Sequence, residues 1–468
     1  MTTARTRTAI LVLLMLIAAA CSREESASTD DGEGTTTEAP ADDGGDDGGG
    51  EADATSLDAG GFGDLEAVCQ EGDASGATAP GVTDTEIVVG TVTDKGGVVA
   101  GLNEEMYDTA VAFTEWCNEH GGILGRQLVL SDADAKLFDY EPAMTEACGR
   151  DFALVGGGAV FDDDPNNVRV GCGLPNIAGY VVSAPGRVAD LQVQPIPNPI
   201  YNISMGRYHA AKAQYPDGIS KFAVMASALP SVLLVKQQTI ETAEQLGFEV
   251  AYQVDYQTQG ETGWANFVRE MQQADVKILD FIGQPQNLVQ LTQEMDLAGW
   301  YPEVILLSGN FYDDLFRQEG GATAGNLFIQ SVFHPLELAE DNKATQDYLD
   351  LMEQYNPDGK VALLGMQGMS SWLLFATAAT ECGSDLTPEC LLEQAEAQED
   401  WTGGGLHSRQ TPGNAQASPC MLILGVTADG FAYNEEATAP TDGDGLFNCD
   451  PDNVIELTGD YGVPRPEA

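Results

Sequence analysis

The feature that most constrains the fold is a repeated alternation of short apolar strands with amphipathic helices. A first run lies within residues 82–195 and a second within 200–334. Alternation of this kind is typical of parallel sheets covered by helices on both faces. It predicts an α/β fold made of two doubly wound lobes. Ligands of such sheets bind beyond the carboxyl ends of the strands, so two facing lobes predict a ligand cleft between them.

The individual elements follow from hydrophobic periodicity. Strands are predicted over 85–93, 127–130, 152–158, 176–183, 221–227, 248–256, 276–283, 303–309, 326–333 and 420–426. Helices are predicted over 103–119, 230–247, 262–274, 287–299, 347–357 and a long segment before Cys382.

The stretch HGGILGRQLVL at 120–130 shows how one such unit is punctuated. Asn103 is expected to cap the preceding helix, and the pair Gly121–Gly122 is expected to end it. Gly125 then turns the chain, and a strand begins at Gln127. The unit is therefore a strand, a helix and a second strand.

The N-terminus carries the pattern of an exported protein. Residues 1–20 hold two arginines, a short apolar run and three alanines, which predicts a signal peptide; a membrane-spanning anchor is the alternative. Cys21 follows directly in LIAAAC, which resembles a bacterial lipobox, with Ala18 where leucine is usual. Residues 21–66 are mostly Gly, Asp, Glu, Ser and Thr and are expected to form an acidic disordered tether.

The formal net charge of −54 limits the partners of the chain. Nucleic acid is not expected as a partner, because binding phosphates requires concentrated Lys and Arg. Attachment to a membrane is expected to come from a lipid on Cys21 rather than from basic residues. The length favours more than one lobe or domain.

Eight cysteines remain once Cys21 is set aside, and an even number in an exported chain indicates disulfide bonds. Eight cysteines allow 105 pairings. The short turn between Cys382 and Cys390 favours that pair, and Cys420–Cys449 would tie back the acidic segment that follows the strand 420–426. Cys148–Cys172, which would clip a helix end across the strand 152–158, is expected next, and Cys69–Cys117 remains as the least supported pair. The four histidines are scattered, so no metal site is expected.

No motif in the chain asks for catalysis, and neither an enzyme nor a cofactor is expected. Gly156–Gly157–Gly158 lacks the lysine of a phosphate-binding loop and is interpreted as a close backbone approach. The acidic segments 161–167 and 441–453 match no EF-hand and are interpreted as surface turns. A catalytic triad assembled in space stays open as an alternative.

Three segments resemble one protein family. GVTDTEIVVGTV (81–92), NEHGGILGRQLVL (118–130) and FALVGG (152–157) are similar to type I periplasmic binding proteins of the branched-chain amino-acid, amide and urea ABC transporters, which are leucine-binding-protein-like receptors. The resemblance implies two lobes joined by three crossings, placed here near 196–204, 333–337 and 400–406. Lobe 1 would hold 67–200 with 335–400. Lobe 2 would hold 201–334 with 401–468, which includes the C-terminal tail.

The resemblance also implies which loops hold the solute. The ligand-binding residues expected from it are Lys95, Val160, Phe161, Tyr180, Leu229, Gln284, Asn310, Phe311 and Tyr312. Amino-acid-binding members have an acid, which receives the ammonium group of the ligand, near the position where this chain has Asn310. Asp313 or Asp314 would take that role after a shift of a few residues. The aromatic residues favour an apolar or aromatic carboxylate or an amide over leucine. Each aromatic residue has the alternative of belonging to a lobe core.

The expected function is that of an extracytoplasmic, lipid-anchored, monomeric receptor. It would close its lobes on a small solute, such as an amino acid, an amide or an apolar carboxylate, and deliver it to ABC permease subunits. A sensory or accessory domain of the same fold is the alternative. An extracellular enzyme is a third hypothesis.

Overall fold

The computed structural model describes residues 54–163, 167–318, 326–414, 416–427 and 430–465. The predicted signal peptide 1–20, Cys21 and the tether as far as residue 53 lie outside these residues. All described residues belong to one compact unit. Within the described ranges, no helix combines the length and apolar character needed to cross a membrane.

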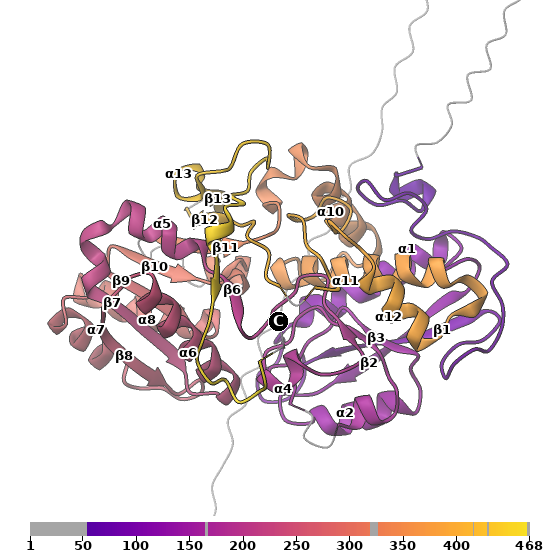
Figure 1. The fold of residues 1–468 in the computed structure, drawn as a ribbon, viewed down its shortest axis with the longest axis horizontal. Helices are drawn as coiled ribbons and strands as arrows, with labels where there is room; N and C mark the ends of the chain where they lie inside the picture. Colours follow the sequence, from indigo (N-terminus) through magenta and orange to yellow (C-terminus); the bar gives the residue numbers. More distant parts are fainter. Residues whose placement is uncertain (1–53, 164–166, 319–325, 415, 428–429, 466–468) are drawn as a thin grey trace, which may run out of the picture. The chain divides into compact units, whose positions relative to one another are not determined.

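Five parallel strands form the first sheet, in the order β2-β1-β3-β4-β5. Strands β1, β2 and β3 are labelled in Figure 1. Their bounds are β1 Glu86–Thr93, β2 Gln127–Asp134, β3 Ala153–Val155, β4 Asn176–Ile177 and β5 Gln192–Val193. Neighbouring residues of β3 enter different cores: Val155 packs with the cluster around Trp372, and Leu154 with the cluster around Met144. Successive side chains of a strand point to opposite faces, so both faces of this sheet are covered.

Helices from two distant parts of the chain cover these faces. The helices of the first part are α1 Glu104–Glu119, α2 Tyr140–Cys148, α3 Val168–Gly171 and α4 Ala184–Arg187. Those of the second are α10 Lys343–Tyr355, α11 Leu363–Cys382 and α12 Pro388–Glu396. Helices α10 and α11 pack against α1, and α2 packs against β2. The late helices thus complete the first lobe.

The second sheet has seven strands, in the order β13-β12-β11-β10-β9-β7-β8. Its parallel strands are β7 Phe222–Ser227, β8 Val250–Tyr256, β9 Ile278–Ile282, β10 Val304–Leu307 and β11 Leu327–Ser331. The antiparallel strands β12 Leu422–Val426 and β13 Phe431–Tyr433 extend its edge. Its helices are α5 Gly206–Gln214, α6 Pro230–Gln245, α7 Trp264–Gln273, α8 Pro285–Ala298, α9 Asp314–Gln318 and α13 Glu435–Thr438. The two sheets confirm the predicted α/β fold with two parallel-sheet lobes.

The glycine-rich stretch 120–130 folds as its sequence indicates. Gly121, Gly122 and Gly125 all have positive φ, at 100°, 72° and 91°, a region that glycine adopts without strain. The Gly122 N–H donates to the carbonyl oxygen of Cys117 over 2.8 Å and closes α1. Strand β2 then begins at Gln127.

The segments between the lobes run beside one another. A two-stranded sheet pairs β6 Asn202–Ser204 with β14 Val454–Glu456. Phe333 and His407 form an antiparallel bridge, and the His334 N–H donates to the Leu406 carbonyl oxygen over 2.9 Å. The second and third predicted crossings therefore share backbone hydrogen bonds.

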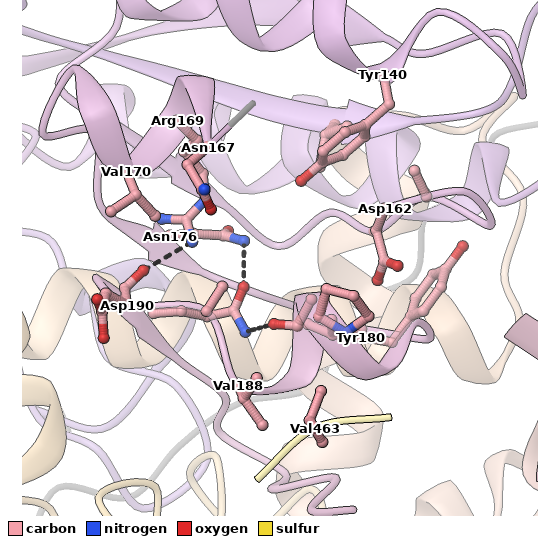
Figure 2. A pocket seen from close by; sticks show the side chains of 18 residues that line it. Tyr140, Asp162, Asn167, Arg169, Val170, Asn176, Tyr180, Val188, Asp190 and Val463 are labelled. Atoms are coloured by element: carbon pink, nitrogen blue, oxygen red, sulfur yellow. Dashed lines mark hydrogen bonds between the residues drawn. The ribbon is translucent and has the colours of Figure 1, made fainter. Parts of the chain in front are cut away.

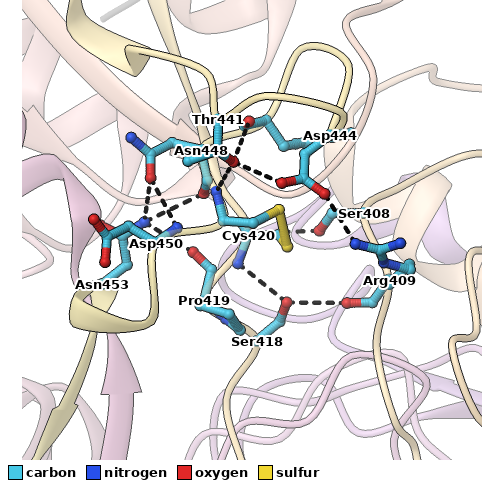
Figure 3. The surroundings of a disulfide bond; sticks show 12 residues. Ser408, Arg409, Ser418, Pro419, Cys420, Thr441, Asp444, Asn448, Asp450 and Asn453 are labelled. Atoms are coloured by element: carbon cyan, nitrogen blue, oxygen red, sulfur yellow. Dashed lines mark hydrogen bonds and ion pairs between the residues drawn. A yellow bond between two sulfur atoms is a disulfide. The ribbon is translucent and has the colours of Figure 1, made fainter.

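Four disulfide bonds join the eight cysteines, and they include the least supported pair, Cys69–Cys117. They are Cys69–Cys117, Cys148–Cys172, Cys382–Cys390 and Cys420–Cys449. Around Cys420–Cys449, the Asn453 amide donates to the Pro419 carbonyl oxygen over 2.9 Å (Figure 3). The disulfide Cys420–Cys449 therefore ties the C-terminal tail to the residues just before β12.

The expectation of a disordered tether is wrong for residues 54–66. Phe62 is fully buried in the core of the first lobe. The Gly63 N–H donates to a carboxylate oxygen of Asp347 over 2.7 Å, and the Trp116 indole donates to the Leu57 carbonyl oxygen over 3.1 Å. One buried aromatic ring and these hydrogen bonds hold a segment whose composition alone favoured disorder.

Candidate functional site

Loops of the first lobe face helix α6 of the second across a cavity of about 380 Å³. We call it the interlobe cavity. It is lined by Val160, Phe161, Asp163, Ser183, Ala184, Pro185, Pro230, Ser231, Leu233, Leu234, Gln237 and Tyr461. The Ser231 hydroxyl donates to the Val160 carbonyl oxygen over 3.2 Å, so the two lobes touch at its edge. Both lobes thus contribute walls to one space.

Asp94 holds the loop that follows β3. It lies at the end of β1, is fully buried, and accepts hydrogen bonds from the N–H groups of Val160 (2.7 Å) and Leu137 (2.8 Å). Burial raises the pKa of Asp94 despite these bonds. The side chain therefore fixes the backbone that carries Val160 and Phe161 into the cavity.

Asp162 couples that loop to the one that follows β4. Its carboxylate accepts from the N–H groups of Val182 (2.6 Å) and Ser183 (2.8 Å), and burial raises its pKa. Ser183 in turn caps α4 by accepting from the Gly186 N–H over 3.0 Å. The first-lobe wall is thus held by two buried carboxylates that accept from backbone donors.

Helix α6 supplies the second-lobe wall. Pro230 occupies its first turn, where a proline costs no helical hydrogen bond. Leu233 and Leu234 give the cavity an apolar side, while Ser231 and Gln237 add polar groups. The positive end of the helix dipole also lies at this wall. This mixture suits a solute with an apolar body and a polar or anionic end.

Tyr180 lines a second cavity, of about 290 Å³, whose walls come from the first lobe and from Val463 of the C-terminal tail (Figure 2). Its hydroxyl accepts from the side-chain amide of Asn103 over 2.7 Å, and the same amide donates to the Gly158 carbonyl oxygen over 2.8 Å. Burial raises the pKa of Tyr180 well above its ordinary value.

Asn103 does not cap α1 with its side chain, contrary to expectation. Its φ is 52°, and its amide is directed toward Tyr180 and Gly158 instead.

Phe311 and Tyr312 do not line either cavity, which corrects the prediction that they bind the ligand. Phe311 is fully buried, and its ring packs edge-to-face against Phe281 and Phe316. Tyr312 is 2% exposed, and its hydroxyl donates to Glu337. The alternative, that both aromatics belong to a lobe core, describes them correctly.

Four further predicted residues lie away from both cavities. Lys95 pairs with Asp132 and lies over the Tyr107 ring. Leu229 and Gln284 are the residues before the first turns of α6 and α8. Asn310 accepts from the Ser308 hydroxyl over 2.6 Å and donates to the Gly283 carbonyl oxygen over 3.0 Å. Of the predicted ligand-binding residues, the structure brings only Val160 and Phe161 to the interlobe cavity.

Asp313, considered as a receptor for a ligand ammonium group, already contacts an ammonium group of the chain. Lys360 Nζ lies 2.8 Å from Asp313 Oδ2 and 3.2 Å from Glu105 Oε2. Burial would lower the pKa of Lys360, but the two carboxylates raise it. Burial also raises the pKa of Glu105. We therefore expect Asp313 to be a poor partner for an incoming ammonium ion.

One buried pair looks catalytic at first sight. Ser370 Oγ lies 2.8 Å from His407 Nε2, and the Trp401 indole donates to the same hydroxyl over 3.0 Å. His407 Nδ1 lies 2.8 Å from the Ser408 carbonyl oxygen, and burial lowers its pKa to about 4. With Ser370 fully buried, this network is structural. In the described part of the chain, no group of three or more His, Cys, Asp or Glu is arranged to hold a metal ion.

Sequence reasoning missed most of the cavity wall. The α6 residues Ser231, Leu233, Leu234 and Gln237 sit in a helix that was predicted, but only loops were considered as ligand-binding segments. The proline at the start of that helix was the available signal. Tyr461 reaches the cavity from the chain end, and nothing in its local sequence indicates that.

A family described as "Periplasmic binding protein" matches residues 203–431, just under half of the chain. No curated protein sequence matches the chain. The family and the solved structures named below are described as binding proteins.

Solved structures cover a larger share of the chain than the family match does. Leucine binding protein LivK from Thermotoga maritima is 13% identical, with a TM-score of 0.62 and coverage of 74% of this chain and 97% of that one. A fatty acid ABC transporter substrate-binding protein from Thermomonospora curvata is 17% identical, with a TM-score of 0.63 and coverage of 79% and 96%. LivJ from Streptococcus pneumoniae, in complex with isoleucine, is 14% identical, with a TM-score of 0.61 and coverage of 75% and 100%. The chain thus has the type I periplasmic binding protein fold.

Proposed function

We propose that this chain is an extracytoplasmic, lipid-anchored solute-binding receptor. It captures one small molecule between its lobes and delivers it to the permease of an ABC transporter. The observation that carries the proposal is the interlobe cavity, whose walls come from both lobes. A solute that touches both walls binds the closed arrangement better and shifts the population toward it.

The cavity favours a solute with an apolar body over a free zwitterion. Its volume of about 380 Å³ lies in the range of small-molecule sites. Phe161, Leu233 and Leu234 supply apolar surface, and Ser231 at the start of α6 supplies a polar end. The Asp313 carboxylate is engaged by Lys360. The one acid that lines the cavity among the described residues, Asp163, is exposed to water, and an ammonium group buried without a carboxylate costs several kcal/mol. We therefore rank an apolar or aromatic carboxylate first, and an amide or amino acid after it.

The names of the fold relatives support the same range of solutes. One structure is described as a leucine binding protein and another as a fatty acid ABC transporter substrate-binding protein. The proposal extends this range to the present chain. Anchoring through Cys21 and action as a monomer remain parts of the proposal that rest on the sequence.

The experiment uses residues 54–468 and four probes, namely isoleucine, isoleucinamide, octanoate and phenylacetate. Calorimetry should detect one site per chain, with octanoate or phenylacetate binding more tightly than isoleucine. Leu233→Asp, which places a charge in the cavity wall, should weaken binding at least tenfold. The matched control is Leu297→Asp on α8, because Leu297 is 81% exposed. The proposal fails if none of the probes binds, or if both variants bind as the native chain does.

A further inference from the structure

A third cavity, of about 210 Å³, lies where the segments between the lobes meet. We call it the hinge cavity. Asn198 lines it from the first crossing, Val332 from the end of β11, and Gln410 from the stretch after the third crossing. It is distinct from the interlobe cavity and shares no lining residue with it.

Arg187, the last residue of α4 in the first lobe, lines the hinge cavity. Its buried Nε has no hydrogen-bond partner. Its Nη1 donates to Gln238 Oε1 at 3.4 Å, which is a long hydrogen bond. Burial lowers the pKa of Arg187 to about 10, and the nearby Asp162 offsets this only in part. The guanidinium is therefore charged at neutral pH and incompletely compensated.

Arg207, in the first turn of α5 in the second lobe, lines the same cavity. It is 6% exposed, and its Nε also has no hydrogen-bond partner. On its other side, Nη2 lies 3.2 Å from Asp280 Oδ2. The carboxylate thus compensates the charge but leaves the Nε–H without an acceptor.

The remaining wall of the hinge cavity combines apolar side chains, such as Ile196, Met205 and Val235, with hydroxyl and amide groups, and its described part contains no carboxylate. Among the described residues that line it are Ser204, Ser308 and Ser418, but no Asp or Glu. The chain carries 74 acidic residues against 20 basic ones. Two arginines that line one cavity without acids are therefore an uncommon feature in a strongly negative protein.

We propose that the hinge cavity binds a small oxyanion between Arg187 and Arg207. A carboxylate, sulfate or phosphate group offers several acceptor oxygens, and guanidinium groups bind such oxygens with charge-assisted hydrogen bonds. Because one arginine comes from each lobe, a bound anion would favour the lobe arrangement seen here.

The test titrates residues 54–468 with inorganic phosphate and, separately, with propionate, at constant ionic strength in a calorimeter. At least one anion should bind to the native chain, and Arg187→Gln should lower its affinity at least tenfold. Arg187→Lys keeps the charge without the guanidinium, so its affinity for the anion should lie between those of the native chain and Arg187→Gln. The control is Arg269→Gln on α7, an exposed arginine that should leave anion binding unchanged. Circular dichroism establishes that each variant is folded.

Comparing the affinities for the two anions distinguishes an inorganic ligand from an organic one. Binding of phosphate alone identifies a free inorganic oxyanion, and binding of propionate identifies the carboxylate of an organic solute. Leu233→Asp should retain anion binding, so failure of the proposed solute site and failure of the hinge site are distinguishable. The inference is overturned if neither anion binds, or if Arg187→Gln binds as tightly as the native chain.

Discussion

Replacing Phe311 with alanine should destabilise the protein strongly, whereas replacing Phe161 should not. Both aromatic residues were expected to contact the ligand, but their surroundings differ. Phe311 is fully buried between Phe281 and Phe316. Phe161 is half-buried at the interlobe cavity and stacks on Phe138, which is 69% exposed.

The magnitude follows from burial. Fully burying a phenylalanine side chain contributes roughly 1.5–3 kcal/mol. Truncation also leaves a cavity, so Phe-to-Ala changes in cores cost about 3–5 kcal/mol. Phe311→Ala should therefore lower the free energy of unfolding by about 3–5 kcal/mol. Phe161→Ala removes a half-buried ring that stacks on an exposed neighbour, so its cost should stay below about 1 kcal/mol.

Chemical denaturation of the native chain and both variants measures the difference. Equal denaturant slopes in the three proteins would show that stability alone has changed. Octanoate affinity supplies the second comparison: Phe161→Ala should weaken it, and Phe311→Ala should leave it unchanged in the folded fraction. A loss below about 1 kcal/mol for Phe311→Ala would refute the assignment of this ring to the lobe core.

Three further predictions concern other parts of the chain. His407 is neutral in the folded state with a pKa of about 4, below its ordinary value near 6.5, so stability should fall as the pH drops from 6.5 toward 4. The loss should be about 2 kcal/mol between pH 7 and 5 and smaller in His407→Gln; an equal loss in both proteins would contradict the assignment. Removing residues 22–53 should leave the melting temperature unchanged and removing 22–66 should lower it, because Phe62 is buried; identical melting temperatures would restore the tether interpretation for the whole segment. Lys360→Met removes the ammonium group that pairs with the carboxylates of Glu105 and Asp313 and should cost roughly 3 kcal/mol in denaturation, and no measurable loss would show that these two ion pairs contribute nothing.

Much of the fold could be predicted because local signals and tertiary packing agree. Helix α6 begins at the predicted Pro230 and ends just before Gly247, whose φ is 84°. Strand β4 is shorter than predicted because the chain turns at Gly179, where a Cβ would lie 2.2 Å from the methyl carbon of Met106. Helix α5 was missed because its sequence, GRYHAAKAQ, is short and polar and gains stability mainly from buried residues such as Tyr208.

The site was less predictable, since it depends on which way a side chain turns at the end of a strand. Val160 and Phe161 turn into the interlobe cavity, while Phe311 turns into the lobe core. An aromatic residue in such a loop suits both places. The convergence of Arg187 and Arg207 depends on long-range packing between the lobes and has no local signal in the sequence.

In the proposed receptor, one small solute occupies the interlobe cavity. Native mass spectrometry of the chain purified under mild conditions detects such a solute, and Leu233→Asp purified in the same way is the comparison. We expect one additional small mass per chain on the native protein and none on the variant. The same additional mass on both proteins, or none on the native protein, would contradict it.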